Sequence, residues 1–412
     1  MTLKVSGALE GLRVLDLTQM LAGPFATQML ADQGADVVKV EPIEGDTTRR
    51  VGPYRADDKI RLFGGYFASV NRNKRSLSVD LKSPEGKALF LDLVAEADCV
   101  VENFRAGVMD RLGLGYELLA SVNPRLVYTS IRGFGDPRCG RSPYCEFPAY
   151  DPVAQAMGGI MGITGPDAAT PLKVGPGIGD LVPAMFAAFG TLAAVWRAGR
   201  TGKGQYVDIA MVDCVLSLCE RIVHQASFTG RPPRPEGNRH PLLTPFGLFP
   251  AADGFVTLAA HTDEFWATLT NLIGRADLIS DQRTATLDAR NANRDFVYET
   301  LSAYTSSRTR AELMSIFGGK TPFGPVYFAD DILADPHFAV REMLVSVEHP
   351  GAAERVTIAG IPVRMTGTPG RIVRRAPFVG EDTRAVLAEW GIAEDRVDRL
   401  ADSGSIRVHT PN

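Results

Sequence analysis

The sequence predicts an α/β fold with a doubly wound sheet, followed by a second, smaller α+β domain. Strand-like apolar runs alternate with helical segments over residues 12–131. The first strand–helix–strand unit takes only about thirty residues, which implies parallel strands. The region after residue 250 has an apolar periodicity of its own. A chain of 412 residues is also too long for one ordinary core, which favours two domains.

The strands expected in the sheet are short and apolar. The first covers residues 12–17 and the second 36–41, and a helix from Phe25 to Gln33 joins them before Gly34 ends it. Further strands are expected at 76–81, 99–102 and 126–131, with helices at 83–97 and 116–122 between them. Strands that alternate with helices in this way are typical of a doubly wound α/β sheet.

The second half of the chain predicts the smaller domain. Residues 229–250 are rich in proline and glycine, as in a linker or crossing segment. A helix is expected at 213–224 before this segment, and a strand at 254–260 after it. Helices are expected at 265–273, 294–305, 309–317 and 383–390, and strand-like runs at 344–348 and 356–358. We therefore place a large domain at 1–225, a linker at 226–245 and a small domain at 246–325.

Composition and charge exclude several classes of function. A net charge of −4 and a pI near 5.9 give no electrostatic reason for binding nucleic acid or an anionic membrane. The apolar run Leu181–Trp196 is too short to span a membrane, and Met1–Glu10 lacks a secretory signal. Five cysteines without CxxC spacing predict reduced thiols in a cytoplasmic protein, and the six histidines predict no metal site.

Two nucleotide-binding motifs are missing. The turn after the first strand reads Ala22-Gly23-Pro24 and lacks the G-x-G-x-x-G pattern of dinucleotide-binding proteins. Residues 200–204 resemble a P-loop only weakly, because no Ser or Thr follows Lys203 and a strand at 205–209 follows where a helix is required. The sequence therefore argues against the use of a nicotinamide cofactor or a nucleoside triphosphate.

Residues 175–180 combine three glycines, a proline and one acid directly before the apolar run 181–196. Asp180 thus marks the start of a buried helix, where it can act as an N-cap. It can also act as a carboxylate nucleophile, because glycines let a substrate approach and helix-end amides favour negative charge. Position alone favours the N-cap, and the two roles are compatible.

Six segments in a fixed order resemble the family III CoA-transferases, which include formyl-CoA transferase, carnitine CoA-transferase and α-methylacyl-CoA racemase. The segments are residues 11–18, 21–24, 34–41, 71–76, 101–104 and 199–204. The resemblance covers nearly the whole chain. It implies a homodimer of two interlocked rings, with a large Rossmann-like domain completed by about residues 330–412. The proline-rich segments 232–245 and 322–336 are compatible with such crossings.

The resemblance makes Asp180 the nucleophile, because the family nucleophile is an aspartate between a glycine-containing loop and a long apolar helix. Its carboxylate is expected to attack an acyl-CoA thioester, giving a mixed anhydride and then an aspartyl-CoA thioester. The N–H groups of Gly177 and Gly179 are expected to stabilise the oxyanions. Coenzyme A is then carried by the substrate, and no prosthetic group is expected.

The family pattern also assigns contacts to coenzyme A. The expected contacts are Leu21, Ala22, Val79, Lys82, Asn103, Phe104, Arg105, Arg111, Tyr150 and Asp151. The helix that begins after Lys82 suits a phosphate at its N-terminus. One position departs from the pattern: Pro42 stands where some relatives carry an arginine, and Arg49 or Arg50 is a candidate replacement.

Tyr150 distinguishes between activities within the family. Racemase relatives carry a histidine acid/base at this position, and tyrosine is a poor base at neutral pH. We therefore expect transfer of coenzyme A to a free carboxylic acid, with a dicarboxylate favoured. Arg239 or His240 is a candidate for binding a second carboxylate. The alternatives are an acyl-CoA racemase or isomerase, or a non-catalytic acyl-CoA-binding protein.

Overall fold

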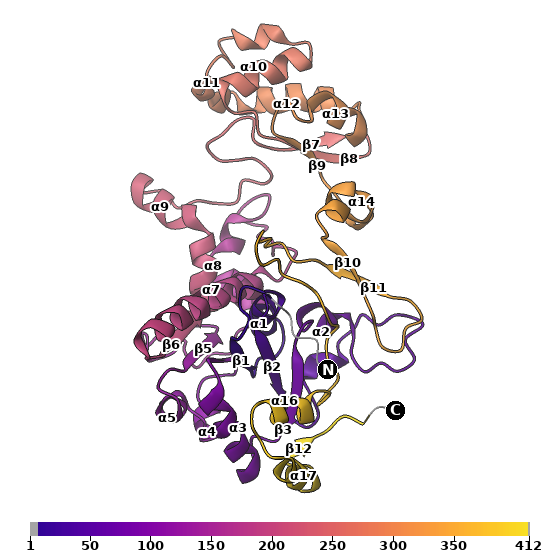
Figure 1. Ribbon diagram of the computed structural model, residues 1–412. Helices are drawn as coiled ribbons and strands as arrows, with labels where there is room; N and C mark the ends of the chain where they lie inside the picture. The colour runs from indigo at the N-terminus through magenta and orange to yellow at the C-terminus, as the bar shows by residue number, and fades with distance from the viewer. Residues whose placement is uncertain (1–6, 411–412) are drawn as a thin grey trace. The chain divides into compact units, whose positions relative to one another are not determined.

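The computed structural model describes residues 7–410, which form two compact units (Figure 1). The first unit contains the chain up to Ile160, Val174–Glu220 and the chain from His337 onward. The second contains Met161–Lys173 and Arg221–Pro336. The chain therefore leaves the first unit and returns to it.

A seven-stranded sheet forms the centre of the first unit, in the order β12-β3-β2-β1-β4-β5-β6. All neighbouring strands are parallel except β12, which pairs antiparallel with β3. The order 3-2-1-4-5-6 is that of a doubly wound dinucleotide-binding sheet. This confirms the predicted α/β class and its parallel sheet. The strands are β1 (Arg13–Asp16), β2 (Asp36–Glu41), β3 (Arg75–Val79), β4 (Cys99–Glu102), β5 (Val127–Arg132), β6 (Gln205–Ala210) and β12 (Ile406–Arg407).

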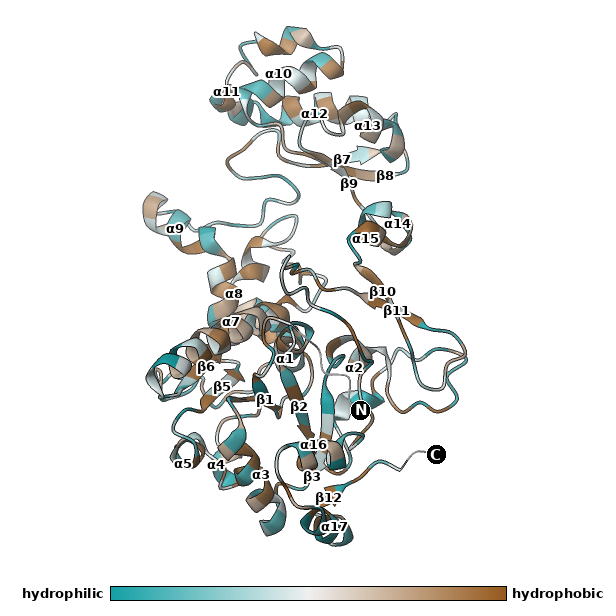
Figure 2. Ribbon diagram, viewed as in Figure 1, coloured by the Kyte–Doolittle hydropathy of each residue, from teal (hydrophilic) through white to brown (hydrophobic). Residues whose placement is uncertain are grey.

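Helices cover both faces of this sheet, because consecutive strand residues point to opposite sides. Leu15, Val38 and Leu77 belong to one core, and Val14 and Val37 to the other. The first core is packed by α3 (Pro84–Glu96), α5 (Tyr116–Val122), α16 (Thr383–Glu389) and α17 (Glu394–Asp402). The second is packed by α1 (Ala22–Asp32) and α7 (Ile178–Thr201). Figure 2 shows brown apolar stretches on the strands and also on the helices.

Helix α7 is longer than the apolar run that marks it in the sequence. It has 24 residues and is long and apolar enough, by length and composition, to cross a membrane. The expectation of a segment too short for this was wrong, because the helix extends through Ile178 at one end and Arg197–Thr201 at the other. In the structure one side of α7 is packed into the sheet core through Ala188, Ala194 and Ala198. This is the packing of a core helix.

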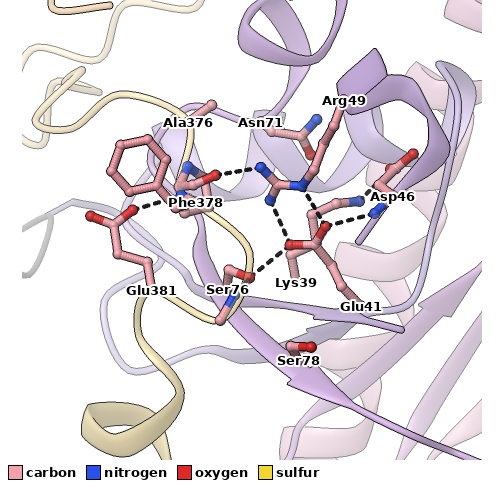
Figure 3. A network of polar contacts seen from close by, with 12 residues as sticks. Lys39, Glu41, Asp46, Arg49, Asn71, Ser76, Ser78, Ala376, Phe378 and Glu381 are labelled. Carbon is pink, nitrogen blue, oxygen red and sulfur yellow. Dashed lines mark hydrogen bonds and ion pairs between the residues drawn. The ribbon is translucent and has the colours of Figure 1, made fainter. Parts of the chain in front are cut away.

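The C-terminal segment is tied to the sheet through a buried ion pair (Figure 3). Arg49 donates from Nε and Nη2 to the two carboxylate oxygens of Glu41, at 2.8 and 2.7 Å. Its Nη1 donates to the carbonyl oxygen of Pro377 at 2.8 Å. Ser76 Oγ donates to Glu41 and accepts from the Gly380 N–H. These bonds fix the returning chain against the ends of β2 and β3.

The remaining elements of the first unit are short. They are η1 (Thr47–Arg50), α2 (Gly65–Val70), α4 (Val108–Arg111), α6 (Asp151–Met157), α8 (Met211–Leu218) and the antiparallel hairpin β10 (Leu344–Val347) and β11 (Val356–Ala359). The single helix expected at 213–224 is two helices, α8 and α9 (Glu220–Thr229), which meet at Cys219. Helix α17 and strand β12 were not predicted.

The second unit has a separate core around the buried side chains of Phe249, Trp266 and Phe317. A three-stranded antiparallel sheet contains β7 (Gly247–Ala251), β8 (Gly254–Leu258) and β9 (Phe323–Pro325). The helices are α9, nearly all of which belongs to this unit, α10 (Asp263–Leu272), α11 (Leu287–Ala292), α12 (Arg294–Thr305), α13 (Arg310–Phe317) and α14 (Ala329–Ala334), with α15 (Pro336–Val340) at the return to the first unit. Strands 254–260 and helices 265–273, 294–305 and 309–317 were predicted within a few residues.

Candidate active site

A cavity of about 220 Å³ lies where the strand order of the large sheet reverses, between β1 and β4. Open α/β sheets bind ligands at this switch point, outside the carboxyl ends of the strands. The cavity is lined from the loops after β1, β4, β5 and β6, from the segment before α6, and from α7. Its lining includes Gln19, Met20, Ala22, Asn103–Ala106, Ile131–Gly133, Cys145–Tyr150, Asp180 and Met211.

Asp180 lies in the first turn of α7, but it is not the N-cap. The helix begins at Ile178, Gly177 occupies the cap position, and Asp180 is the third helical residue. The Asp180 backbone N–H donates to the Gly177 carbonyl at 3.1 Å. Within residues 7–410 no hydrogen bond or ion pair is made by its carboxylate, which lines the cavity. The capping interpretation is therefore wrong, and the carboxylate is available for chemistry.

The environment of Asp180 disfavours its charged form. Burial, and then the nearby negative charge of Asp151, raise the pKa of Asp180 from 3.8 to about 7. A carboxylate with this pKa is far more basic than an ordinary aspartate and is still substantially ionised near neutrality. Strongly perturbed carboxyl groups in a cavity are typical of functional sites.

Asp151 and Gln155 hold the chain on which Asp180 sits. Asp151 Oδ1 accepts from the Gly179 N–H at 2.9 Å and from Gln155 Nε2 at 2.8 Å. Gln155 is fully buried, and its Oε1 accepts from the Val174 N–H at 2.9 Å. These contacts fix both ends of the glycine loop against α6. The Gly179 N–H is occupied by Asp151, so Gly177 is the glycine whose amide is unpartnered within the described chain.

Sequence reasoning found Asp151 but missed Gln155. The glutamine follows Asp151 by four residues, which places both on one face of α6. That spacing was a usable signal. The contact with Val174, nineteen residues further along, leaves no local trace in the sequence.

The residues expected to contact coenzyme A divide into two groups. Ala22, Asn103, Phe104, Arg105 and Tyr150 line the cavity. Leu21 packs against Gly177, and Asp151 lies beneath Gly179. The structure thus brings the segments after β1 and β4 together with the start of α7.

The other expected contacts lie outside the cavity lining. The Val79 side chain is in the sheet core, where a ligand cannot reach it. Lys82 and Arg111 are exposed, at the β3–α3 turn and the end of α4. The Arg49 guanidinium binds Glu41 and the Pro377 carbonyl, so it does not replace the arginine missing at Pro42. The other candidate, Arg50, is exposed.

Arg239 and His240 belong to the second unit. Arg239 pairs with Asp295 at 2.6 Å and stacks over the Tyr298 ring at 4.4 Å. His240 Nδ1 accepts from the Leu242 N–H at 3.1 Å. Both side chains thus have partners within their own unit.

A Rossmann-order sheet with an unpartnered carboxylate in a cavity at its switch point indicates a ligand-binding α/β protein, and sequence comparison gives its class. The profile of CoA-transferase family III matches residues 9–383, so the chain belongs to this family. The protein is therefore a CoA-transferase, which confirms the predicted family and enzyme type.

Named relatives cover nearly the whole chain. It is 49% identical to succinyl-CoA:mesaconate CoA-transferase of Haloarcula hispanica, over 94% of this chain and 97% of that protein. It is 38% identical to succinate–glutarate CoA-transferase of Agrobacterium fabrum, over 92% and 95%. The crystal structure of a CAIB/BAIF family protein from Brucella suis matches with a TM-score of 0.82 and 36% identity, over 93% and 100%.

Proposed function

We propose that the protein moves coenzyme A from an acyl-CoA thioester to a dicarboxylic acid through covalent intermediates on Asp180. The observation that carries this proposal is the Asp180 carboxylate itself. It lines the cavity, has no partner within the described chain, and has a pKa raised to about 7. A carboxylate that served only as a helix cap would accept a backbone hydrogen bond, which the Asp180 carboxylate does not do among the residues that the structure describes.

The reaction proceeds in balanced steps. A carboxylate oxygen of Asp180 attacks the thioester carbonyl, the C–S bond breaks, and coenzyme A leaves as a thiolate. The thiolate attacks the Asp180 carbonyl of the resulting anhydride, releasing the donor acid and leaving an aspartyl-CoA thioester. The acceptor carboxylate attacks that thioester, and the thiolate then attacks the acceptor's acyl carbon, which frees Asp180.

The protein's contribution to these steps is electrostatic and positional. The unpartnered N–H of Gly177, at the N-terminus of α7, supports negative charge at the reacting oxygens. The Asp151 charge raises the energy of the ionised nucleophile and favours its conversion to a neutral acyl derivative. Gln155 keeps Asp151 and the glycine loop in place, because it donates to the Asp151 carboxylate and accepts from the Val174 N–H.

A dicarboxylate substrate is supported by the relatives and by the size of the site. Relatives of this chain are named for transfer between succinyl-CoA and mesaconate, and between succinate and glutarate. The cavity of about 220 Å³ is smaller than the roughly 300–1,000 Å³ of sites for drug-sized ligands. A short acyl group fits this volume better than a fatty acyl chain.

We further propose that two chains form the interlocked homodimer. Helix α9 has no buried residue, and its Phe228 is 89% exposed. On α7, Phe189 is 72% and Trp196 69% exposed. Large apolar side chains that remain exposed in one chain are typical of an interface. Interlocked chains do not separate without unfolding, so sedimentation at nanomolar concentration should show dimers; folded monomers would overturn the interlocking.

Trapping tests the covalent mechanism. The anhydride and the aspartyl thioester are electrophiles, so hydroxylamine should add to Asp180 only when acyl-CoA is present. Peptide mapping should find the modified mass on the peptide that contains residue 180. An Asp180→Asn variant keeps the size of the side chain but lacks the nucleophile, and it should fold, bind acyl-CoA and show no turnover.

Asp151→Asn is the matched control for Asp180→Asn. It makes the same chemical change on the neighbouring carboxylate and should retain the trapped adduct on Asp180. A fully active Asp180→Asn enzyme, with deamidation excluded by mass spectrometry, would refute the mechanism. Loss of labelling in both variants would show that the change disturbs the site in general.

A further inference from the structure

The turn between β1 and α1 is strained where it faces the cavity. Met20 has a φ of 67°, in the left-handed region that non-glycine residues rarely adopt. Such strain persists only where the surrounding structure holds it, and it is concentrated at functional sites. Met20 and the preceding Gln19 both line the cavity that contains Asp180.

Asn103 holds this turn from the next strand of the sheet. Its Oδ1 accepts from the Gln19 N–H at 2.8 Å, and its Nδ2 donates to the Gln19 carbonyl at 2.7 Å. The oxygen and the nitrogen of the Asn103 side-chain amide therefore both bind the backbone of Gln19. This leaves its side chain little capacity for the direct contact with coenzyme A expected from the sequence.

Buried charges hold the residue before the turn. Lys39 Nζ donates to the Thr18 carbonyl at 2.8 Å, and the Thr18 N–H donates to Asp16 Oδ1 at 2.9 Å. Lys39 and Asp16 are fully buried. The backbone that carries Gln19 is thus fixed from both sides before any substrate arrives.

The Gln19 side chain is one of the polar groups of the cavity that are free to bind a ligand, as is the exposed side chain of Arg105. No hydrogen bond is made by its amide within residues 7–410, while Asn103 is occupied. Arg132 is paired with Glu102 at 3.3 Å and also with Asp136. A primary amide offers two N–H donors, and a carboxylate can accept a hydrogen bond from either.

We propose that Gln19 determines substrate specificity by donating a hydrogen bond to the distal carboxylate of the acyl group, and that Asn103 is the positioning residue that aims it. The inference rests on the proposed dicarboxylate function and names the group that recognises the second carboxylate. Preorganisation of the backbone matters here, because the side chain of Gln19 is then the only part that must be ordered when the substrate binds.

Isotope exchange provides a direct measurement. In the first assay, labelled succinate exchanges with the succinyl group of succinyl-CoA on the intact enzyme. In the second assay, labelled butyrate exchanges with butyryl-CoA, whose acyl group lacks a distal carboxylate. A hydrogen bond to a charged group contributes enough that Gln19→Leu should lower the succinyl/butyryl ratio of kcat/KM about tenfold to a hundredfold. Gln19→Glu should lower it further, because two carboxylates then repel each other.

Two further variants separate positioning from general damage. Asn103→Ala should lower the same ratio of kcat/KM values. Its far-ultraviolet circular dichroism spectrum, and its midpoint of thermal unfolding measured without succinyl-CoA, should stay close to those of the wild type. Gln282→Leu makes the matched change at an exposed glutamine of the second unit and should leave the ratio unchanged.

The outcomes distinguish this inference from the proposed function. If wild-type enzyme shows no preference for succinate over butyrate, the dicarboxylate proposal fails. If wild type has the preference and Gln19→Leu keeps it, the assignment of Gln19 is wrong. If Arg105→Ala removes the preference while Gln19→Leu does not, the exposed arginine of the cavity takes the distal carboxylate.

Discussion

Replacing Asp180 by asparagine should stabilise the fold while it removes activity. The folded state raises the pKa of Asp180 from 3.8 to about 7. Between these values the unfolded chain has released a proton that the folded protein still holds. Stability therefore falls as the pH rises through this window, because the folded protein must then carry a buried charge. Asparagine carries no charge at any of these pH values.

The magnitude follows from the two pKa values. A raise of about three pKa units corresponds to about 4 kcal/mol of unfolding free energy at 1.36 kcal/mol per unit. The Asp180→Asn variant should gain about this much at pH 8, where the wild-type carboxylate is ionised in both states. At pH 5 the gain should be only about 2 kcal/mol, since the folded wild type is then largely protonated.

Urea denaturation at pH 5 and pH 8 measures this difference, and unfolding rates serve where unfolding is irreversible. Asp330→Asn is a suitable control, because Asp330 is exposed on α14 and the change should matter little at either pH. A gain for Asp180→Asn that is equal at the two pH values, or a loss at pH 8, would refute the reasoning.

Three further predictions follow from the site. Asp151→Asn removes the charge that helps to raise the pKa of Asp180, so the rise of single-turnover acylation with pH should move to lower pH; an unmoved profile would contradict this. Lys82→Ala and Arg111→Ala should raise KM for acyl-CoA more than they lower kcat, because the nucleotide is bound alike in ground and transition states; unchanged KM values would remove both residues from the site. Turnover of a chiral 2-methylacyl-CoA in deuterated water should leave the α-carbon unlabelled, because Tyr150 is a poor base; label appearing as fast as transfer would favour a racemase.

Local patterns predicted the sheet because its strands are apolar runs set between helices. The strands β2 and β4 were predicted at the residues where the structure has them, and the alternation predicted that strands of this sheet run parallel, as both do to β1. Helix α17 was missed because it is mostly charged and buries only Val397 and Leu400. Strand β12 has two residues, which is too few for a period of two to appear. Tertiary packing decides both elements.

The site was predictable only where its residues are contiguous. The glycine loop before an apolar helix identified Asp180, with the family resemblance deciding its role. The Asn103–Gln19 clamp spans 84 positions, and nothing near either residue signals it. The raised pKa of Asp180 comes first from burial and then from Asp151, 29 residues earlier. The packing of two helices sets both.

That packing also explains the glycine that precedes the nucleophile. A Cβ at position 179 would lie 2.5 Å from the Asp151 carbonyl oxygen and 3.1 Å from the Ala154 Cβ, closer than side-chain atoms normally come. Glycine therefore lets α6 approach the first turn of α7, and its N–H then reaches the Asp151 carboxylate at 2.9 Å. The sequence suggested that Gly179 exposes an amide to the substrate. The contacts indicate instead that it brings a second negative charge next to Asp180, which adds to the effect of burial in raising the pKa of the nucleophile.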